Sequence, residues 1–168
     1  MSMARASSIS PFFSATESML MYPSGNRDPR AFDDPDARTS LCTLIESRLP
    51  LARWAILSDY AKGVCDTSVC RTVIETGKRH GTRVIVDPKG PDFAKYAGAA
   101  VITPNQSEAA AVVGFPIHDA DAGLRAACRI RDAFEIDSVV VTLGDMGLAV
   151  VGAEGSAVIP ARAQRVFD

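Results

Sequence analysis

The segment Val101–Gly114, VITPNQSEAAAVVG, contains the strand–helix junction on which the fold assignment depends. A short apolar run leads into Pro104, which lacks an N–H group and disfavours helical geometry in the residue before it, so a strand should end there. Asn105 is a preferred N-cap residue, and Glu108 falls in the first helical turn, where a negative charge suits the helix dipole. The segment therefore predicts a buried strand followed directly by a helix.

This junction has two interpretations. An N-cap Asn followed three residues later by Glu is the pattern of a capping box, in which the two side chains close the helix and have no further role. A strand end beside a helix N-terminus is also where open α/β sheets bind ligands, phosphates in particular. In the second case Glu108 would hold a cation carried by the phosphates. The segment alone is compatible with both.

Outside the junction, apolar runs with strand character alternate with helical periodicity. We expect helices at residues 35–49, 67–80 and 105–113, and a further helix that starts at 119 or 121 and ends at about 134. We expect strands at 54–57, 83–86, 100–102, 138–142, 148–151 and 157–160. Near-continuous apolar strands are typical of an open parallel sheet covered by helices on both faces. The strands flanking the turn at 144–147 are joined too closely for a crossover and should be antiparallel. The predicted fold class is α/β, Rossmann-like and mostly parallel, with an antiparallel strand pair near the C-terminus.

Composition narrows the class of protein. A chain of 168 residues with 47% hydrophobic and 23% charged residues fits one globular domain. The formal net charge of −2 gives no broad basic face, so we expect neither nucleic acid nor a membrane as partner. Four cysteines lack CxxC spacing, which argues against a zinc site, and scattered thiols indicate a reducing compartment. We therefore expect the cytoplasm.

The first part of the chain differs from the rest in amino-acid composition and in hydrophobic periodicity. Residues 1–34 show no sustained period and are rich in Ser, Pro, Gly, Asn and Asp, which is typical of a flexible lead-in. Asp34 can cap a helix, and Pro35 suits the first helical position. We therefore expect the folded domain to cover residues 35–168.

Polar segments follow four of the predicted strands, and in a parallel sheet such strand ends share one edge. These segments are residues 59–63, 87–90, 103–108 and 142–147. Lys62 and Lys89 could neutralise phosphates as point charges. Asp59 and Asp87 could hold water on Mg²⁺, which usually keeps several waters and few protein ligands. The lysine and aspartate residues of these segments thus favour a phosphate-containing ligand at this edge.

Four motifs occur in order along the chain: LSDYAKGV at 57–64, VIVDPKGPDFAKYAGA at 84–99, ITPNQSEAAAVVG at 102–114 and VVTLGDMGLAVV at 140–151. Together they resemble the PfkB (ribokinase-like) carbohydrate kinases, and within that family the kinases that act on heptose 7-phosphate. The resemblance implies a ribokinase-like fold, ATP-dependent phosphorylation of a sugar or sugar phosphate, and ATP and Mg²⁺ as cofactors. A single GxxG turn would be weak evidence, because hairpin turns use glycine anyway.

The resemblance also assigns roles to individual residues. Glu108 would organise Mg²⁺ through water, and Asp87 is a second, weaker candidate metal ligand. The residues implied in nucleotide binding come from three of the motifs: Lys89, Asn105, Gln106, Ser107, Glu108, Thr142, Leu143, Gly144 and Gly147. Phosphoryl transfer depends on positioning and charge neutralisation, so a metal-organising carboxylate and phosphate-facing amides fit that chemistry.

The chain also departs from the family pattern. The family's catalytic base is an aspartate in a GAGD motif, which these 168 residues do not contain, and Asp168 aligns ahead of that motif. Residues 1–34 do not resemble the family's sugar-binding part and lid. We therefore expect an incomplete kinase domain and assign no catalytic residue. The alternative is an inactive remnant or a partner-dependent nucleotide-binding module, with a homo-oligomer or a complementing chain as partner.

Overall fold

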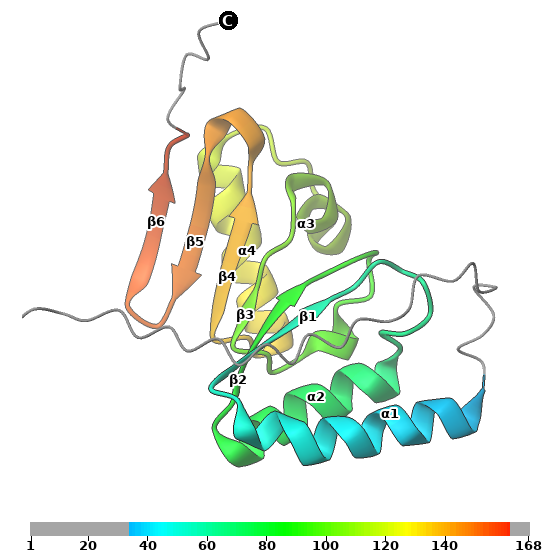
Figure 1. Cartoon of the computed structure of the whole chain (residues 1–168). Coiled ribbons are helices and arrows are strands. Elements are labelled where there is room, and N and C mark those ends of the chain that lie inside the picture. The colour runs from blue at the N-terminus through cyan, green and yellow to red at the C-terminus, as the bar shows by residue number, and fades with distance from the viewer. Residues whose placement is uncertain (1–33, 162–168) are drawn as a thin grey trace, which may run out of the picture.

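The computed structural model describes residues 34–161. Its sheet has six strands in the order β1-β2-β3-β4-β5-β6 (Figure 1). The strands are β1 (Trp54–Ser58), β2 (Arg83–Asp87), β3 (Val101–Ile102), β4 (Ser138–Thr142), β5 (Leu148–Gly152) and β6 (Gly155–Ile159). The α-helices are α1 (Pro35–Arg48), α2 (Thr67–His80), α3 (Gln106–Val113) and α4 (Ala120–Phe134). Three short 3₁₀ turns complete the described elements: η2 (Leu49–Leu51), η3 (Ala94–Tyr96) and η4 (Gly144–Met146).

Local chemistry fixes the helix boundaries. Every α-helix begins after an Asp or Asn whose side chain accepts a backbone N–H of the first turn: Asp34, Asp66, Asn105 and Asp119. Such caps satisfy amide groups that have no partner within the helix. The α2 helix ends at Gly81, whose φ of 76° is left-handed and therefore favours glycine. These signals are local, so the sequence predicts the helices to within a residue or two.

The strand pairing confirms the predicted fold class. Strands β1 to β4 are parallel neighbours in chain order. The β4–β5 and β5–β6 pairs are antiparallel, as expected for strands joined by short turns. The described part is therefore a mixed sheet, parallel over its first four strands and antiparallel at its C-terminal end.

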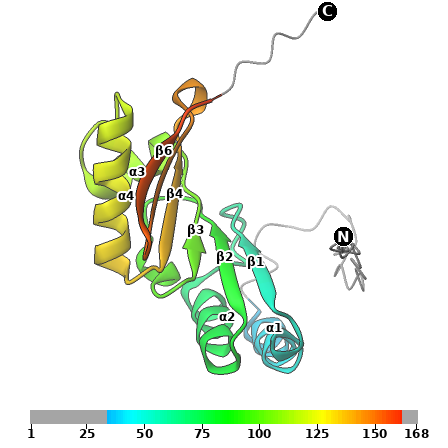
Figure 2. The same ribbon diagram turned by 90° about the vertical axis from the view of Figure 1, so that its left-hand side faces the viewer.

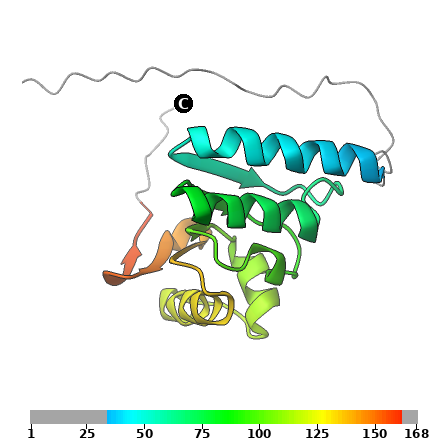
Figure 3. The same ribbon diagram turned by 90° about the horizontal axis from the view of Figure 1, so that it is seen from below.

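Within residues 34–161 the α-helices lie on one face of the sheet, whereas the apolar strands suggested helices on both faces. Buried strand residues such as Leu57, Val86 and Val141 alternate with more exposed neighbours, and all three belong to the core that the helices cover. Figure 2 shows α4 on one side of β4 and β6. Figure 1 shows α1 and α2 below the sheet, and Figure 3, seen from below, shows these two helices running alongside each other. Because β1 to β4 are neighbours in chain order, crossovers of one hand place their helices on the same face.

The opposite face, which we call the open face, is apolar as well. Its residues follow from the register, since paired residues point to the same side: Trp54, Ile56, Ile85, Val101, Val140, Leu148, Val150, Ala157 and Ile159. Ile56 is 75% exposed, and Trp54 and Ile159 are each 52% exposed. Apolar residues on both sides of each strand explain why the sequence suggested two covered faces, although the described helices cover only one.

Two further expectations concern segments rather than the sheet. The lead-in predicted for residues 1–34 lies outside the described residues except for Asp34, which caps α1. Within residues 34–161, none of the helices combines the length and the apolar character needed to cross a membrane.

A pair of adjacent substitutions in β1 tests the one-sided core. Leu57→Ala should lower the free energy of unfolding by about 2–4 kcal/mol, because Leu57 is 6% exposed and its loss leaves a cavity under the helices. Ile56→Ala should cost less than about 1 kcal/mol in the monomer, at low protein concentration, because that side chain is on the open face. Urea denaturation of both variants measures the difference. Equal costs would mean that a second layer covers Ile56.

Candidate functional site

The carboxyl ends of β1 to β4 surround a cleft of about 380 Å³. Open parallel sheets bind ligands at this edge, because the strand exits and helix N-termini meet there. The lining residues come from all four exits: Asp59, Tyr60, Asp87, Pro88, Lys89, Thr103, Asn105, Glu108 and Thr142. The predicted convergence of four polar strand exits on one cleft is therefore observed.

The β3–α3 junction forms a complete capping box at the wall of this cleft. The backbone N–H of Glu108 donates to Asn105 Oδ1 over 2.9 Å, and the backbone N–H of Asn105 donates to Glu108 Oε2 over 3.0 Å. The capping interpretation is thus correct as geometry. The same two side chains line the cleft, so the cap and a ligand site coexist at one position.

Lys89 brings a positive charge from the next strand exit to this carboxylate. Its Nζ lies 3.0 Å from Glu108 Oε1, the oxygen that the cap does not use. The Glu108 side chain is only 12% exposed, whereas that of Lys89 is 53% exposed. Glu108 is therefore a fixed charge at the cleft wall, and Lys89 is a solvent-exposed side chain that forms an ion pair with it.

A second carboxylate, Asp59, lies buried at the end of β1. Its Oδ2 accepts hydrogen bonds from Lys95 Nζ and from the Tyr96 hydroxyl, each over 2.6 Å, and its Oδ1 accepts the backbone N–H of Ala61 over 2.7 Å. The side chain of Asp59 is 2% exposed. A charge this deeply buried is tolerated only when it is paired and hydrogen-bonded, which these three donors achieve.

The surroundings shift the pKa of both acidic partners. Burial by itself raises the pKa of Asp59, but the hydrogen bonds from Lys95, Tyr96 and Ala61 and the charge of Lys95 outweigh it, so the pKa lies below its usual value. Burial, then the hydrogen bond to Asp59, raises the pKa of Tyr96. The carboxylate therefore stays ionised and the phenol stays a proton donor at neutral pH.

Tyr96 also connects this buried group to the loop after β2. The backbone N–H of Lys89 donates to the Tyr96 hydroxyl oxygen over 3.3 Å, while the same hydroxyl donates to Asp59. The exits of β1, β2 and β3 are thus joined by a continuous series of contacts that runs from Asp59 through Tyr96 and Lys89 to Glu108.

The acidic residues at the cleft fit a divalent cation that arrives with a phosphate ligand. Asp87 is exposed, and its Oδ2 accepts a hydrogen bond from the Ser58 hydroxyl over 3.1 Å. Within residues 34–161, no group of three His, Cys, Asp or Glu side chains could hold a metal by itself. Mg²⁺ is usually bound by one or two carboxylates together with substrate phosphates and water. Glu108 and Asp87 supply carboxylates of that kind.

The remaining residues predicted to bind nucleotide differ in their placement. Thr142 lines the cleft and is bridged to Asn105. Gln106 instead donates its side-chain amide to the Ile117 carbonyl, and Leu143 is buried in the core at 1% exposure. Ser107 is exposed at the start of α3. For Gln106 and Leu143, only backbone groups remain available to a ligand at this cleft, and Ser107 is not among the residues that line it.

The two glycines of the TLGDMG turn, Gly144 and Gly147, are each favoured by a different feature of the backbone. Gly144 is exposed, with a φ of 64° and open space where a Cβ would lie. Gly147 has a φ of 96°, and a Cβ there would collide with the carbonyl of Ile159. The close approach at Gly147 is therefore to the end of β6, and neither glycine lines the cleft.

Lys95 and Tyr96 are the site residues that sequence reasoning missed, because they lie in η3, within a segment expected to be a plain loop. The signal available was the segment PDFAKYAGA in the second motif. An aromatic residue and a lysine adjacent in a loop do not by themselves predict a buried pair, since their common partner, Asp59, is 36 residues earlier in the chain than Lys95.

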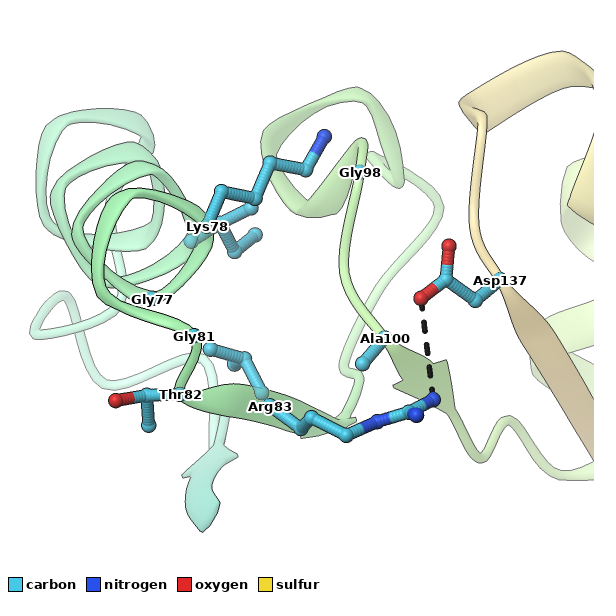
Figure 4. A pocket seen from close by; sticks show the side chains of 10 residues that line it. Gly77, Lys78, Gly81, Thr82, Arg83, Gly98, Ala100 and Asp137 are labelled. Carbon is cyan, nitrogen blue, oxygen red and sulfur yellow. Dashed lines mark ion pairs between the residues drawn. The ribbon is translucent and has the colours of Figure 1, made fainter. Parts of the chain in front are cut away.

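A second hollow, of about 280 Å³, lies at the amino edge of the strands, away from the predicted motif residues of the cleft (Figure 4). Lys78 extends over Gly98, and Arg83 reaches toward Asp137 at 3.9 Å. Both members of this ion pair are more than half exposed, so the pair contributes little. This hollow is therefore a weaker candidate for a functional site than the cleft at the carboxyl edge of the sheet.

The lowered pKa of Asp59 predicts a pH-dependent stability difference. Above its unfolded pKa, near 3.8, the ionised group stabilises the fold, and this contribution is lost as pH falls through the lower folded pKa. Asp59→Asn should cost about 3 kcal/mol at pH 7, and the gap to the wild type should narrow below about pH 4. Denaturation at several pH values measures it, with the exposed Asp92→Asn as control. A gap independent of pH would contradict the assignment.

Curated proteins share much of this sequence. The bifunctional protein HldE of Gluconacetobacter diazotrophicus is 43% identical over 136 residues, which cover 80% of this chain and 28% of that protein. HldE of Methylobacillus flagellatus is 42% identical over 113 residues, 67% of this chain and 23% of that protein. The chain thus spans less than a third of the length of these curated relatives.

Solved structures share the fold. Phosphofructokinase-2 from Escherichia coli, in complex with potassium, superposes with a TM-score of 0.64 at 21% identity, covering 76% of this chain and 42% of that one. The model of the pfkB family of carbohydrate kinases matches residues 34–168, which include all four motifs and every residue of the cleft. The predicted resemblance is confirmed, and the chain belongs to the pfkB carbohydrate kinase family.

Proposed function

We propose that this chain contributes the nucleotide-binding part of an ATP- and Mg²⁺-dependent sugar kinase of the cytoplasm, and that the sugar is heptose 7-phosphate. The observation that carries the proposal is the cleft in which Lys89, Asn105, Glu108 and Thr142 meet at the carboxyl edge of the sheet. The choice of sugar rests on the identity with the two bifunctional HldE proteins.

Each side of the cleft has a role in this proposal. The first turn of α3 leaves backbone N–H groups without helical partners, and those of Gln106 and Ser107 would face phosphate oxygens. Lys89 would neutralise phosphate charge. Glu108, with Asp87 nearby, would hold water on Mg²⁺, which when bound stabilises the charge that develops on the transferred phosphoryl group.

The base that would accept the proton of the sugar hydroxyl is not assigned, since the 168 residues contain no GAGD motif. The second candidate is therefore a nucleotide-binding module that does not catalyse transfer alone. Phosphate transfer from ATP to heptose 7-phosphate, above the level of a Glu108→Gln variant, supports the kinase. Nucleotide binding without transfer supports the module.

Glu108→Gln is a suitable test of the nucleotide site, because a capping box accepts Gln as well as Glu at this helix position, so the cap remains while the charge is lost. We expect the affinity for Mg·ATP to fall about tenfold, as for loss of a charge-assisted contact. The rise in melting temperature with Mg·ATP reports the affinity. The exposed Glu154→Gln variant is the matched control. An equal thermal shift in wild type and Glu108→Gln would contradict the proposed metal role.

We also propose that the chain self-associates through the open face defined above. Large exposed apolar patches on soluble proteins mark interaction surfaces. Sedimentation velocity at rising concentration should show a dimer in the wild type and a monomer in Ile56→Glu. Leu51→Glu is the control, because Leu51 is 80% exposed but lies in η2, outside the sheet. A wild-type monomer at every concentration would refute self-association.

A further inference from the structure

The carboxylate of Glu108 already has a partner on each oxygen. Oε2 accepts the backbone N–H of Asn105 over 3.0 Å, and Oε1 accepts Lys89 Nζ over the same distance. The first contact belongs to the helix cap and involves backbone, so it is fixed. The second involves the tip of a flexible side chain. A cation that approaches Glu108 therefore competes with Lys89 for Oε1.

We propose that Lys89 is an exchangeable counterion for Glu108. Its ammonium group neutralises the carboxylate in the absence of ligand and moves to a phosphate oxygen when the bound water of a divalent cation carried by a nucleotide reaches Oε1. This deepens the proposed function, on which it rests, by stating that the metal and Lys89 exclude each other at one carboxylate oxygen.

The backbone of Lys89 is held while its side chain is free to move. The N–H of Lys89 donates to the Tyr96 hydroxyl, which donates in turn to the buried carboxylate of Asp59. The preceding residue, Pro88, is fully buried. The Lys89 side chain is 53% exposed and carries a four-carbon stem, so its ammonium can change partner without a change in the main chain.

Electrostatics explains why a metal–nucleotide complex, rather than metal alone, favours the move of Lys89 away from Glu108. An ammonium group and a divalent cation repel each other even when a metal-bound water lies between the cation and the carboxylate, so they do not share Oε1. A phosphate oxygen brought in by the same ligand offers the displaced ammonium a new anionic partner. The Lys89 side chain is half exposed, so its ion pair with Glu108 is weak enough to break. Divalent metal alone gives Lys89 no such partner, whereas a metal–nucleotide complex does.

The exchange predicts opposite effects of one substitution on two ligands. Lys89→Gln removes the competitor, so binding of Mn²⁺ alone, followed by the loss of the free-ion electron paramagnetic resonance signal, should tighten about two- to fivefold. The same variant loses its phosphate contact, so binding of Mg·ATP, followed by calorimetry, should weaken about tenfold. A merely structural ion pair would not produce changes of opposite sign.

Three variants serve as controls. Lys89→Arg keeps the positive charge and should bind Mn²⁺ as weakly as the wild type. Lys62→Gln removes an exposed cation from the β1 exit and should leave Mn²⁺ binding unchanged. Adding Glu108→Gln to Lys89→Gln should abolish the gain in Mn²⁺ affinity, because the carboxylate is the site of competition.

Opposite shifts in Lys89→Gln, abolished by Glu108→Gln, support the exchange. Shifts of the same sign, or Mn²⁺ affinity no higher than in the wild type, overturn it while leaving the proposed nucleotide site in place if Mg·ATP still binds. A wild-type chain that does not bind Mg·ATP overturns the proposed function, and the exchange with it. Circular dichroism of each variant confirms that it is folded.

Discussion

Three donors converge on the carboxylate of Asp59, and the shape of the cleft depends on that convergence. The donors are an ammonium group and a phenol from the connection between β2 and β3, and a backbone amide from the loop after β1. Separating these two segments would leave a charge buried without partners, which costs far more than a lost surface contact. The electrostatic requirement of one side chain thus holds two strand exits together.

The order of the strands imposes the second constraint. Neighbouring parallel strands in chain order bring their carboxyl ends to one edge, where the cleft forms, and bring their helices to one face. The pattern of apolar residues along β1, with Trp54 and Ile56 on one side and Leu57 on the other, predicts a strand but not which side is covered. Covering depends on the hand and order of the crossovers, which a strand's own sequence does not contain.

Features determined by neighbours in the chain were predictable from sequence. The capping box of Asn105 and Glu108 and the glycine after α2 follow from residues a few positions apart. The position of Tyr96 does not, because its partner Asp59 follows β1, 37 residues earlier in the chain. The TLGDMG turn shows a different difficulty: the backbone at the end of β6 leaves no room for a side chain at Gly147, a contact that the motif does not reveal. A sequence motif identifies which residue occupies a position, but it does not show which contact in the structure requires that residue.

Trp54 gives the open face an optical property of its own. It is the only tryptophan in the 168 residues, it is half exposed, and the guanidinium of Arg83 lies 5.2 Å from its ring centroid. It stands at the amino end of β1, whereas the cleft lies beyond the carboxyl end. Indole emission depends on the polarity around the ring, so the tryptophan fluorescence of this protein reports the environment of the open face alone. Whatever covers that surface will shift the spectrum without an added label, and a ligand in the cleft will leave it nearly unchanged.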